Sequence, residues 1–192
     1  LGSCTMKYNP KINEQIASQA QFSSIHPNQS DLYSQSALQV IYDLEQMLKK
    51  ITGMTGFTLQ PSAGSQGEFV GLLLMRKYHE MKNNNKNIIL IPESAHGTNP
   101  ASVILAGYKP VELATDKRGR VDINDLKSKV NKDVAGLMLT QPNTLGLFED
   151  QISLISDLIH EVDGLMYMDG ANLNALIGLV KPADMGFDIT HI

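Results

Sequence analysis

Asp169 is the residue of this sequence that stands best placed to do chemistry. It follows a short apolar run, Leu165 to Met168, which Gly164 precedes and Gly170 follows. A run of this length and composition predicts a buried strand of a parallel sheet, apolar on both faces. Open α/β sheets bind ligands beyond the carboxyl ends of their strands, where a carboxylate can hold a cation or a protonated ring nitrogen. Capping the turn into a following helix is an equally open role for Asp169.

Ser65 and Gln66 lie in a second turn, between Gly64 and Gly67. Ser65 and Glu68 have the spacing of a capping box, which predicts that a helix begins here. Amides at a helix N-terminus, approached through glycine, form a natural seat for a phosphate. A plain tight turn explains the two glycines equally well.

His96 stands in a third loop, shortly after the apolar run 88–91. A histidine in such a loop can face a pocket, although a solvated loop histidine is the simpler alternative. Because parallel strands end at the same edge of a sheet, four loops are expected to share one pocket. These loops are 61–67, 92–99, 140–146 and 169–174.

The elements that must position these loops alternate between helices and strands. Helical spacing of apolar residues predicts helices at about 31–53, 65–81, 122–130 and 150–162, with a short one ending near Gly107. Strands are predicted at 56–60, 88–91, 108–113, 134–139 and 165–168, and a last one within 187–192. Strands separated by crossover helices predict an α/β fold, a three-layer α/β/α sandwich with a mostly parallel sheet.

Composition limits the classes of function. A net charge of -4 disfavours a nucleic-acid partner, because phosphate backbones bind basic faces. No apolar run approaches the roughly 20 residues that a membrane span requires. The one cysteine, Cys4, cannot form an internal disulfide, which favours the cytoplasm. The start lacks Met and the end falls within a predicted strand, so we expect a piece of a longer protein.

Four stretches, in this order along the chain, resemble the glycine-decarboxylating component, or P-protein, of the glycine cleavage system. They are Leu1–Lys7, Gln60–Glu68, Ser94–Ser102 and Tyr167–Asn174. The compact run Lys7–Asn13 is most similar to the second subunit of the two-subunit bacterial form. The resemblance implies the large domain of a pyridoxal-phosphate (PLP) enzyme of fold type I. It implies that glycine loses CO2 and that the aminomethyl group passes to a lipoyl carrier protein, with a companion P-protein subunit 1 as partner.

The family's motifs also imply roles for individual residues. Asp169 would hold the protonated pyridine nitrogen of PLP, and His96 would stack on the ring. The remaining cofactor contacts implied by the resemblance are Ser65 and Gln66 at the phosphate, Asn143 near the ring hydroxyl, and Thr190 and His191 beside the phosphate. No metal is implied.

The family's Schiff-base lysine would follow Thr190-His191, and no lysine of this sequence occupies that position. Lys181, before a Pro-Ala-Asp turn, is expected to be a solvated charge. We therefore expect activity in the parent protein and none in this piece alone. We expect an irregular arm over 1–30 and the PLP-binding large domain, truncated at both ends, over 31–192.

Two other readings stay open. The first is a nucleotide-binding α/β domain that seats a phosphate on the Gly64–Gly67 turn. The spacing differs from Gly-x-Gly-x-x-Gly, and no acidic residue follows about 20 positions later at a strand end, which disfavours it. The second is a catalytically silent structural domain, which the missing lysine supports for the piece but not for its parent.

Overall fold

The computed structural model of this chain describes residues 9–192. The first eight residues of the predicted arm, with Cys4 and the Leu1–Lys7 motif, lie outside the described residues. The chain divides into two compact units, Leu1–Gln46 and Met47–Ile192. None of the helices in 9–192 combines the length and apolar character that a membrane crossing requires.

The first unit is helical. It contains α1 (Lys11–Ala17), α2 (Ala20–Ser23), the 3₁₀ turn η1 (Asp31–Tyr33) and the start of α3 (Gln35–Thr52). The two short helices correct the expectation that 1–30 is irregular. The backbone hydrogen bonds at the ends of α1 and α2 come from residues three or four positions away. Such local bonds do not depend on a buried apolar face, so the lack of apolar periodicity did not reveal these helices. The predicted helix at 31–53 is confirmed as α3. No residue from 9 to 46 is buried, and Ile41 and Leu44 of the predicted apolar stripe are 48% and 43% exposed.

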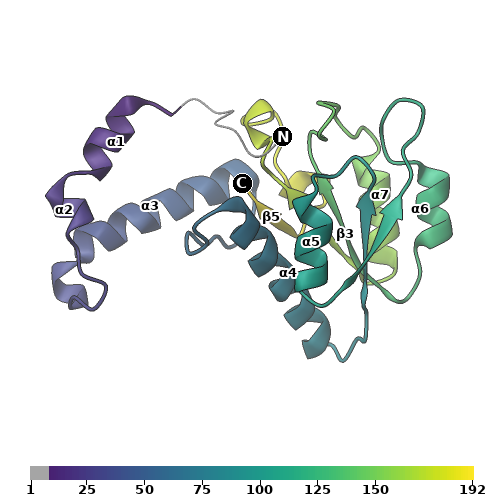
Figure 1. Cartoon of the computed structure of the whole chain (residues 1–192), viewed down its shortest axis with the longest axis horizontal. Coiled ribbons are helices and arrows are strands. Elements are labelled where there is room, and N and C mark those ends of the chain that lie inside the picture. The colour runs from purple at the N-terminus through teal and green to yellow at the C-terminus, as the bar shows by residue number, and fades with distance from the viewer. Residues whose placement is uncertain (1–8) are drawn as a thin grey trace. The chain divides into compact units, whose positions relative to one another are not determined.

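The second unit is built on a five-stranded sheet whose strands all run parallel, in the order β2-β1-β3-β4-β5 (Figure 1). The strands are β1 (Ile88–Pro92), β2 (Lys109–Leu113), β3 (Val134–Thr140), β4 (Leu165–Asp169) and β5 (Ile189–His191). Five of the predicted strands are therefore confirmed. The central strand β3 is buried along its whole length, as its apolar sequence requires in a parallel sheet.

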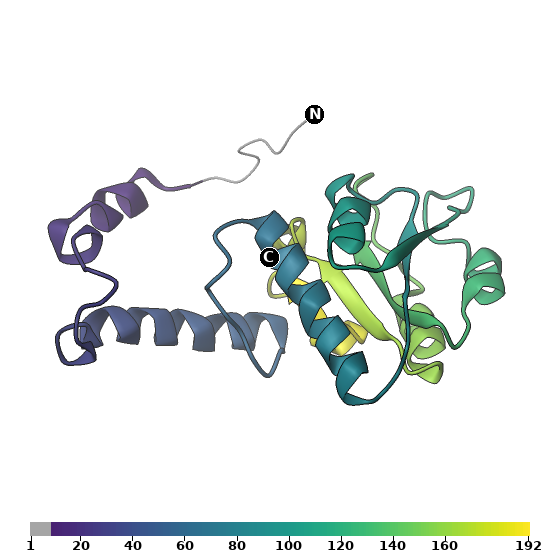
Figure 2. The ribbon, with the colours of Figure 1, turned by 60° about the horizontal axis from the view of Figure 1, so that its bottom comes forward.

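Helices cover both faces of this sheet (Figures 1 and 2). The helices α4 (Gly64–Met81) and α5 (Thr98–Leu105) share one hydrophobic core with one face of the sheet. The helices α6 (Ile123–Lys129) and α7 (Ile152–Glu161) share the other core. Successive strand residues alternate between the two cores, as with Leu137 and Met138 of β3. The predicted three-layer α/β/α sandwich is confirmed.

The strand predicted at Gly56–Gln60 is wrong. These residues form no strand, and no strand of the described chain pairs with them. The alternation of Phe57 and Leu59 suits a half-buried strand, but Leu59 is 36% exposed and has no sheet beside it. A strand needs a neighbour for its backbone groups, and local pattern cannot supply one.

The order of the strands indicates where a ligand would bind on this sheet. The chain passes from β1 outward to β2 and then returns to β3 on the other side of β1. Ligands of such sheets bind outside the carboxyl ends of the strands, near the point where the order reverses. The loops that follow β1, β3 and β4 emerge at this end, and β5 ends beside Asp169 through the Asp169–His191 register pair.

Candidate functional site

Asp169 is the last residue of β4 and is only 3% exposed. Its carboxylate accepts three hydrogen bonds. The backbone N–H of Ala171 and Nε2 of His191 lie 3.0 and 3.2 Å from Oδ1. Nδ2 of Asn99, in the first turn of α5, lies 3.1 Å from Oδ2. A carboxylate offers about four acceptor positions, so one remains for a further donor.

These donors set the charge of Asp169. Burial alone raises the pKa of a carboxyl, but the His191 hydrogen bond and charge, the Ala171 N–H and the Asn99 amide together lower the pKa of Asp169 to about 2. Asp169 is therefore a buried carboxylate that stays ionised at neutral pH. Such a group can keep a protonated ring nitrogen protonated through a charge-assisted hydrogen bond.

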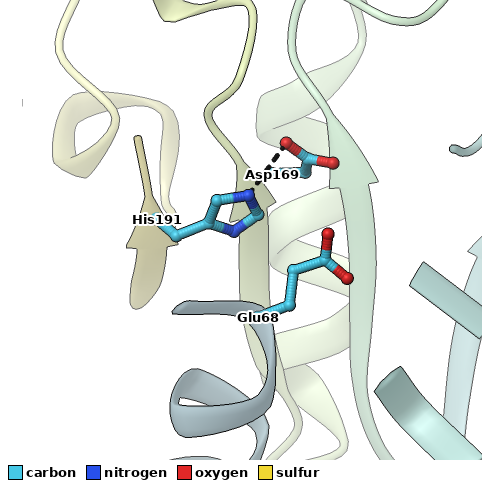
Figure 3. Close-up of side chains that lie close together, drawn as sticks. All are labelled: Glu68, Asp169 and His191. Carbon is cyan, nitrogen blue, oxygen red and sulfur yellow. Dashed lines mark ion pairs between the residues drawn. The ribbon is translucent and has the colours of Figure 1, made fainter. Parts of the chain in front are cut away.

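His191 of β5 lies between Asp169 and the start of α4, as Figure 3 shows. Nδ1 of His191 is 3.0 Å from the hydroxyl of Tyr167, which itself donates to the carbonyl of Gly67 at 3.2 Å. Burial, with the charges of Glu68 and Asp169, raises the pKa of Tyr167, so the phenol stays protonated. His191 is thus held on both ring nitrogens.

The N-terminus of α4 lies beside His191. Ala63 is the N-cap residue and no side chain caps the helix, so the first amides of α4 have no intrahelical partner. Ser65 and Gln66 are exposed in this first turn. A Cβ at Gly67 would lie 3.0 Å from Cβ of His191, so glycine permits this close approach. The geometry fits an anion seat beside His191.

The capping-box interpretation of Ser65 and Glu68 is wrong, although the helix start it predicted is confirmed. Glu68 is buried, and no side chain caps the start of α4. Its Oε1 accepts from the hydroxyl of Thr98 and its Oε2 from that of Ser102, both at 2.8 Å. The capping pattern is local, whereas the partners of Glu68 come from α5, 30 and 34 residues away in the sequence.

His96 stands just before α5 and is exposed. Its Nδ1 lies 2.7 Å from Oγ1 of Thr98, the hydroxyl that also donates to Glu68. The ligand atoms of Glu68, Asp169 and His191 lie within 4.8 Å of one another. Two bonded sets of polar groups therefore lie side by side: His96, Thr98 and Glu68 in one, and Asn99, Asp169 and His191 in the other.

The same three side chains, Glu68, Asp169 and His191, have the types and the closeness that a metal site requires (Figure 3). The hydrogen bonds of Glu68 and His191 already engage every atom that would bind an ion there. Both oxygens of Glu68 accept hydroxyl donors, and both ring nitrogens of His191 have partners. We therefore assign no metal to them.

Asn143 stands apart from this set. Its amide donates to the carbonyl of Gly119 at 2.9 Å, and its Oδ1 accepts from the backbone N–H groups of Leu145 and Leu147. It lines a small cavity of about 10 Å³ with Ala95 and residues of β1 and β3. These bonds leave one amide hydrogen of Asn143 free for another acceptor.

Thr190 is half-buried on β5, and its hydroxyl lies 3.1 Å from the carbonyl oxygen of His191. The structure thus brings Asp169, His191 and the start of α4 together. His96 bonds Thr98, whose partner Glu68 has its carboxylate within 4.8 Å of the ligand atoms of Asp169 and His191. Sequence reasoning missed Asn99, Thr98 and Tyr167. The burial of Glu68 could have been predicted from the sequence. It has the helical spacing of Leu72, Met75 and His79, which form the buried stripe of α4.

The fold is shared with solved structures of low sequence identity. A crystal structure of glycine decarboxylase (P-protein) of the glycine cleavage system, in inhibitor-bound form, matches 94% of this chain and 40% of its own with a TM-score of 0.76 at 20% identity. An aromatic aminotransferase from Pyrococcus horikoshii matches 69% of this chain and 36% of its own with a TM-score of 0.55 at 24% identity. The large domain of fold type I enzymes, predicted from the sequence, is confirmed as the fold.

The sequence comparisons are more specific. A family model described as "Glycine cleavage system P-protein" matches residues 2–191. Proteins named "Probable glycine dehydrogenase (decarboxylating) subunit 2" are similar over all of this chain, with 54% identity in Chlorobium phaeovibrioides and in Pyrococcus horikoshii. This chain belongs to the glycine cleavage system P-protein family. It spans 40% and 38% of the length of those two relatives.

Proposed function

We propose that this chain forms the cofactor-binding part of a PLP-dependent glycine decarboxylase. The parent enzyme would release CO2 from glycine and pass the aminomethyl group to a lipoyl carrier protein, with a companion P-protein subunit 1 as its partner. The family match and the relatives' names, glycine dehydrogenase (decarboxylating) subunit 2, support this proposal. Because the chain covers about two fifths of those relatives, activity is proposed for the complete protein.

One observation carries the proposal: the ionised, buried Asp169 lies beside an open helix N-terminus in a fold that places ligands at this edge. PLP has an anionic phosphate and a basic ring nitrogen. The uncapped amides of α4 suit the first, and the remaining acceptor position of Asp169 suits the second. The residues therefore fit this cofactor, with Ser65, Gln66, Thr190 and His191 at the phosphate end.

Each residue has a defined task in this proposal. When bound, PLP supplies a sink for the electron pair that stays on the substrate carbon as CO2 leaves. Asp169 holds a proton on the ring nitrogen, because its low pKa keeps the partner carboxylate charged. His96 stacks on the ring and holds it in place. Asn143 uses its free amide hydrogen toward the ring hydroxyl.

We also propose the extent and the location of this part. Residues 31–192 would form the large domain and 1–30 an arm, and the pocket side chains named above all belong to the unit Met47–Ile192. The single cysteine in the sequence is the reason to place the protein in the cytoplasm.

The test is a comparison of ligands on the purified complete protein. We expect PLP to raise its melting temperature and NAD to leave it unchanged. With PLP, the companion subunit 1 and a lipoyl carrier protein present, glycine labelled at its carboxyl carbon should release labelled CO2. Stabilisation by NAD but not by PLP would favour the nucleotide-binding alternative, and binding of neither would favour a silent domain.

A further inference from the structure

Glu68 has an environment that neither the core nor the proposed cofactor contacts explain. It is 4% exposed and occupies the core-facing stripe of α4 with Leu72 and Met75. Within the described part of the chain, no Lys or Arg forms an ion pair with it. Burying a carboxyl group costs free energy unless hydrogen bonds compensate, and its compensating donors are the hydroxyls of Thr98 and Ser102.

Counting protons along these contacts determines the state of His96. A threonine hydroxyl has one hydrogen, and Thr98 donates it to Oε1 of Glu68. Oγ1 of Thr98 can then only accept from Nδ1 of His96, 2.7 Å away. With the hydroxyl directed this way, Nδ1 carries the proton, which leaves the lone pair of a neutral His96 on Nε2.

One contact favours the opposite assignment. The backbone N–H of Thr98 also points at Nδ1 of His96, which would require a lone pair there. That contact is long, at 3.3 Å, whereas the hydroxyl contact is 2.7 Å. The shorter bond in the chain that ends at Glu68 decides the tautomer, because hydrogen bonds weaken with distance.

We infer that Glu68 is a positioning residue that acts through Thr98 to fix the imidazole of His96 with its proton on Nδ1 and its lone pair on Nε2. The inference rests on the proposed function for its purpose, since His96 is the proposed ring-stacking residue. The carboxylate, hydroxyl and imidazole form a relay. It holds the plane of the imidazole and leaves Nε2 as a proton acceptor.

A purely structural role for Glu68 makes a different prediction. If Glu68 only attaches α5 to α4, its two hydroxyl partners are equivalent, and the tautomer of His96 is independent of both. In the relay, only Thr98 touches His96, while Ser102 occupies the other oxygen of Glu68. Ser102 is therefore the matched control for Thr98.

The experiment uses the complete protein without cofactor, with ¹³C,¹⁵N-labelled histidine, in magic-angle-spinning NMR at pH 8.5. The signal of His96 is identified by its loss in His96→Gln. We expect protonated Nδ1 in the native protein, and we expect Thr98→Val to remove that signal in favour of protonated Nε2. Thr98→Ser, which keeps the hydroxyl, should restore the native signal.

Two further variants separate the relay from packing. Ser102→Ala should keep the native signal, whereas Glu68→Gln should lose part of it, because an amide can donate to Thr98 and release its proton toward His96. Protonated Nε2 in the native protein, or a signal indifferent to Thr98→Val, would overturn the inference. Equal loss in Ser102→Ala and Thr98→Val would overturn it too. Since no cofactor is present, failure of the proposed activity appears only in the separate CO2 assay.

Discussion

Two groups of buried or half-buried polar residues lie near the same end of the sheet and are bonded in different ways. The β3 loop cluster consists of Gln141, Asn143 and Glu149. Its side chains bond to backbone groups: Gln141 pairs with both the N–H and the carbonyl of Glu149, and Glu149 accepts from the backbone N–H of Val121. Asn143 bonds to three backbone groups of its own loop and of Gly119.

The β4 pocket cluster consists of Glu68, Thr98, Asn99, Asp169 and His191. Its side chains bond mainly to other side chains, including one another, across α4, α5, β4 and β5. Bonds to the backbone set the shape of a loop, whereas bonds between side chains set the charge and orientation of a reactive group. The β3 loop cluster therefore mainly sets the shape of its loop, and Asn143 is its one member with a proposed cofactor contact. The β4 pocket cluster sets the charge of Asp169.

The largest effect on stability is expected in the β3 loop cluster, with Gln141→Ala. Gln141 is fully buried, and its loss leaves the N–H and the carbonyl of Glu149 unpaired. Two such groups cost about 2–6 kcal/mol together, measured as the free energy of unfolding in urea. Lys127→Ala, an exposed change on α6, is the control. If Gln141→Ala lost PLP affinity and kept its stability, the β3 loop cluster would serve the cofactor site and not the shape of its loop.

The next effect is the pH dependence of Asp169. Its pKa is about 2 in the folded protein and 3.8 ordinarily, so it contributes stability that is present above about pH 4. That contribution, about 2 kcal/mol, is lost as the pH falls from about 4 to 2. Asp169→Asn should flatten this part of the unfolding curve. If the free energy of unfolding of Asp169→Asn fell as steeply below about pH 4 as that of the native protein, the lowered pKa of Asp169 would be contradicted.

Asn99→Ala should separate function from stability. The amide bonds the carboxylate of Asp169, while its buried Oδ1 has no partner, so the residue gives the fold little net stability. We expect PLP to bind about tenfold more weakly, from the loss of one hydrogen bond to a charged group, with less than about 1 kcal/mol change in unfolding. Asn124→Ala on the exposed side of α6 is the matched control. Unchanged PLP affinity would exclude Asn99 from the pocket cluster.

The smallest effect concerns His79, at the far end of α4. Burial lowers its pKa from 6.5, although the Ala135 carbonyl that it bonds acts in the other direction. A lowered histidine pKa means that its stabilising effect is complete above about pH 6.5 and declines as the pH falls. Native and His79→Gln protein should therefore differ less at pH 5.5 than at pH 7.5 in their free energy of unfolding. A constant difference would show that His79 does not titrate differently on folding.

The sequence predicts the layers well and the site in part. The strands β1, β3 and β4 are apolar on both faces, so their sequence alone distinguishes them from loops. The motifs lead to Asp169, His96 and the start of α4, since all three follow strand ends or begin a helix. Asn99 could not be predicted, because its partner Asp169 is 70 residues away and only the packing of α5 on β4 joins them. Glu68 was misassigned for the same reason: a local capping pattern competed with partners supplied by tertiary structure.

The most direct measurement of the central claim is the rate of labelled CO2 release from carboxyl-labelled glycine by the complete protein, native and Asp169→Ala, with PLP, the companion subunit 1 and a lipoyl carrier protein. Losing a charge-assisted hydrogen bond of roughly 1.5–3 kcal/mol should slow the rate about 10- to 100-fold. The circular dichroism spectrum should remain that of the native fold. A variant that releases CO2 at the native rate would show that Asp169 caps a turn and that the cofactor site lies elsewhere.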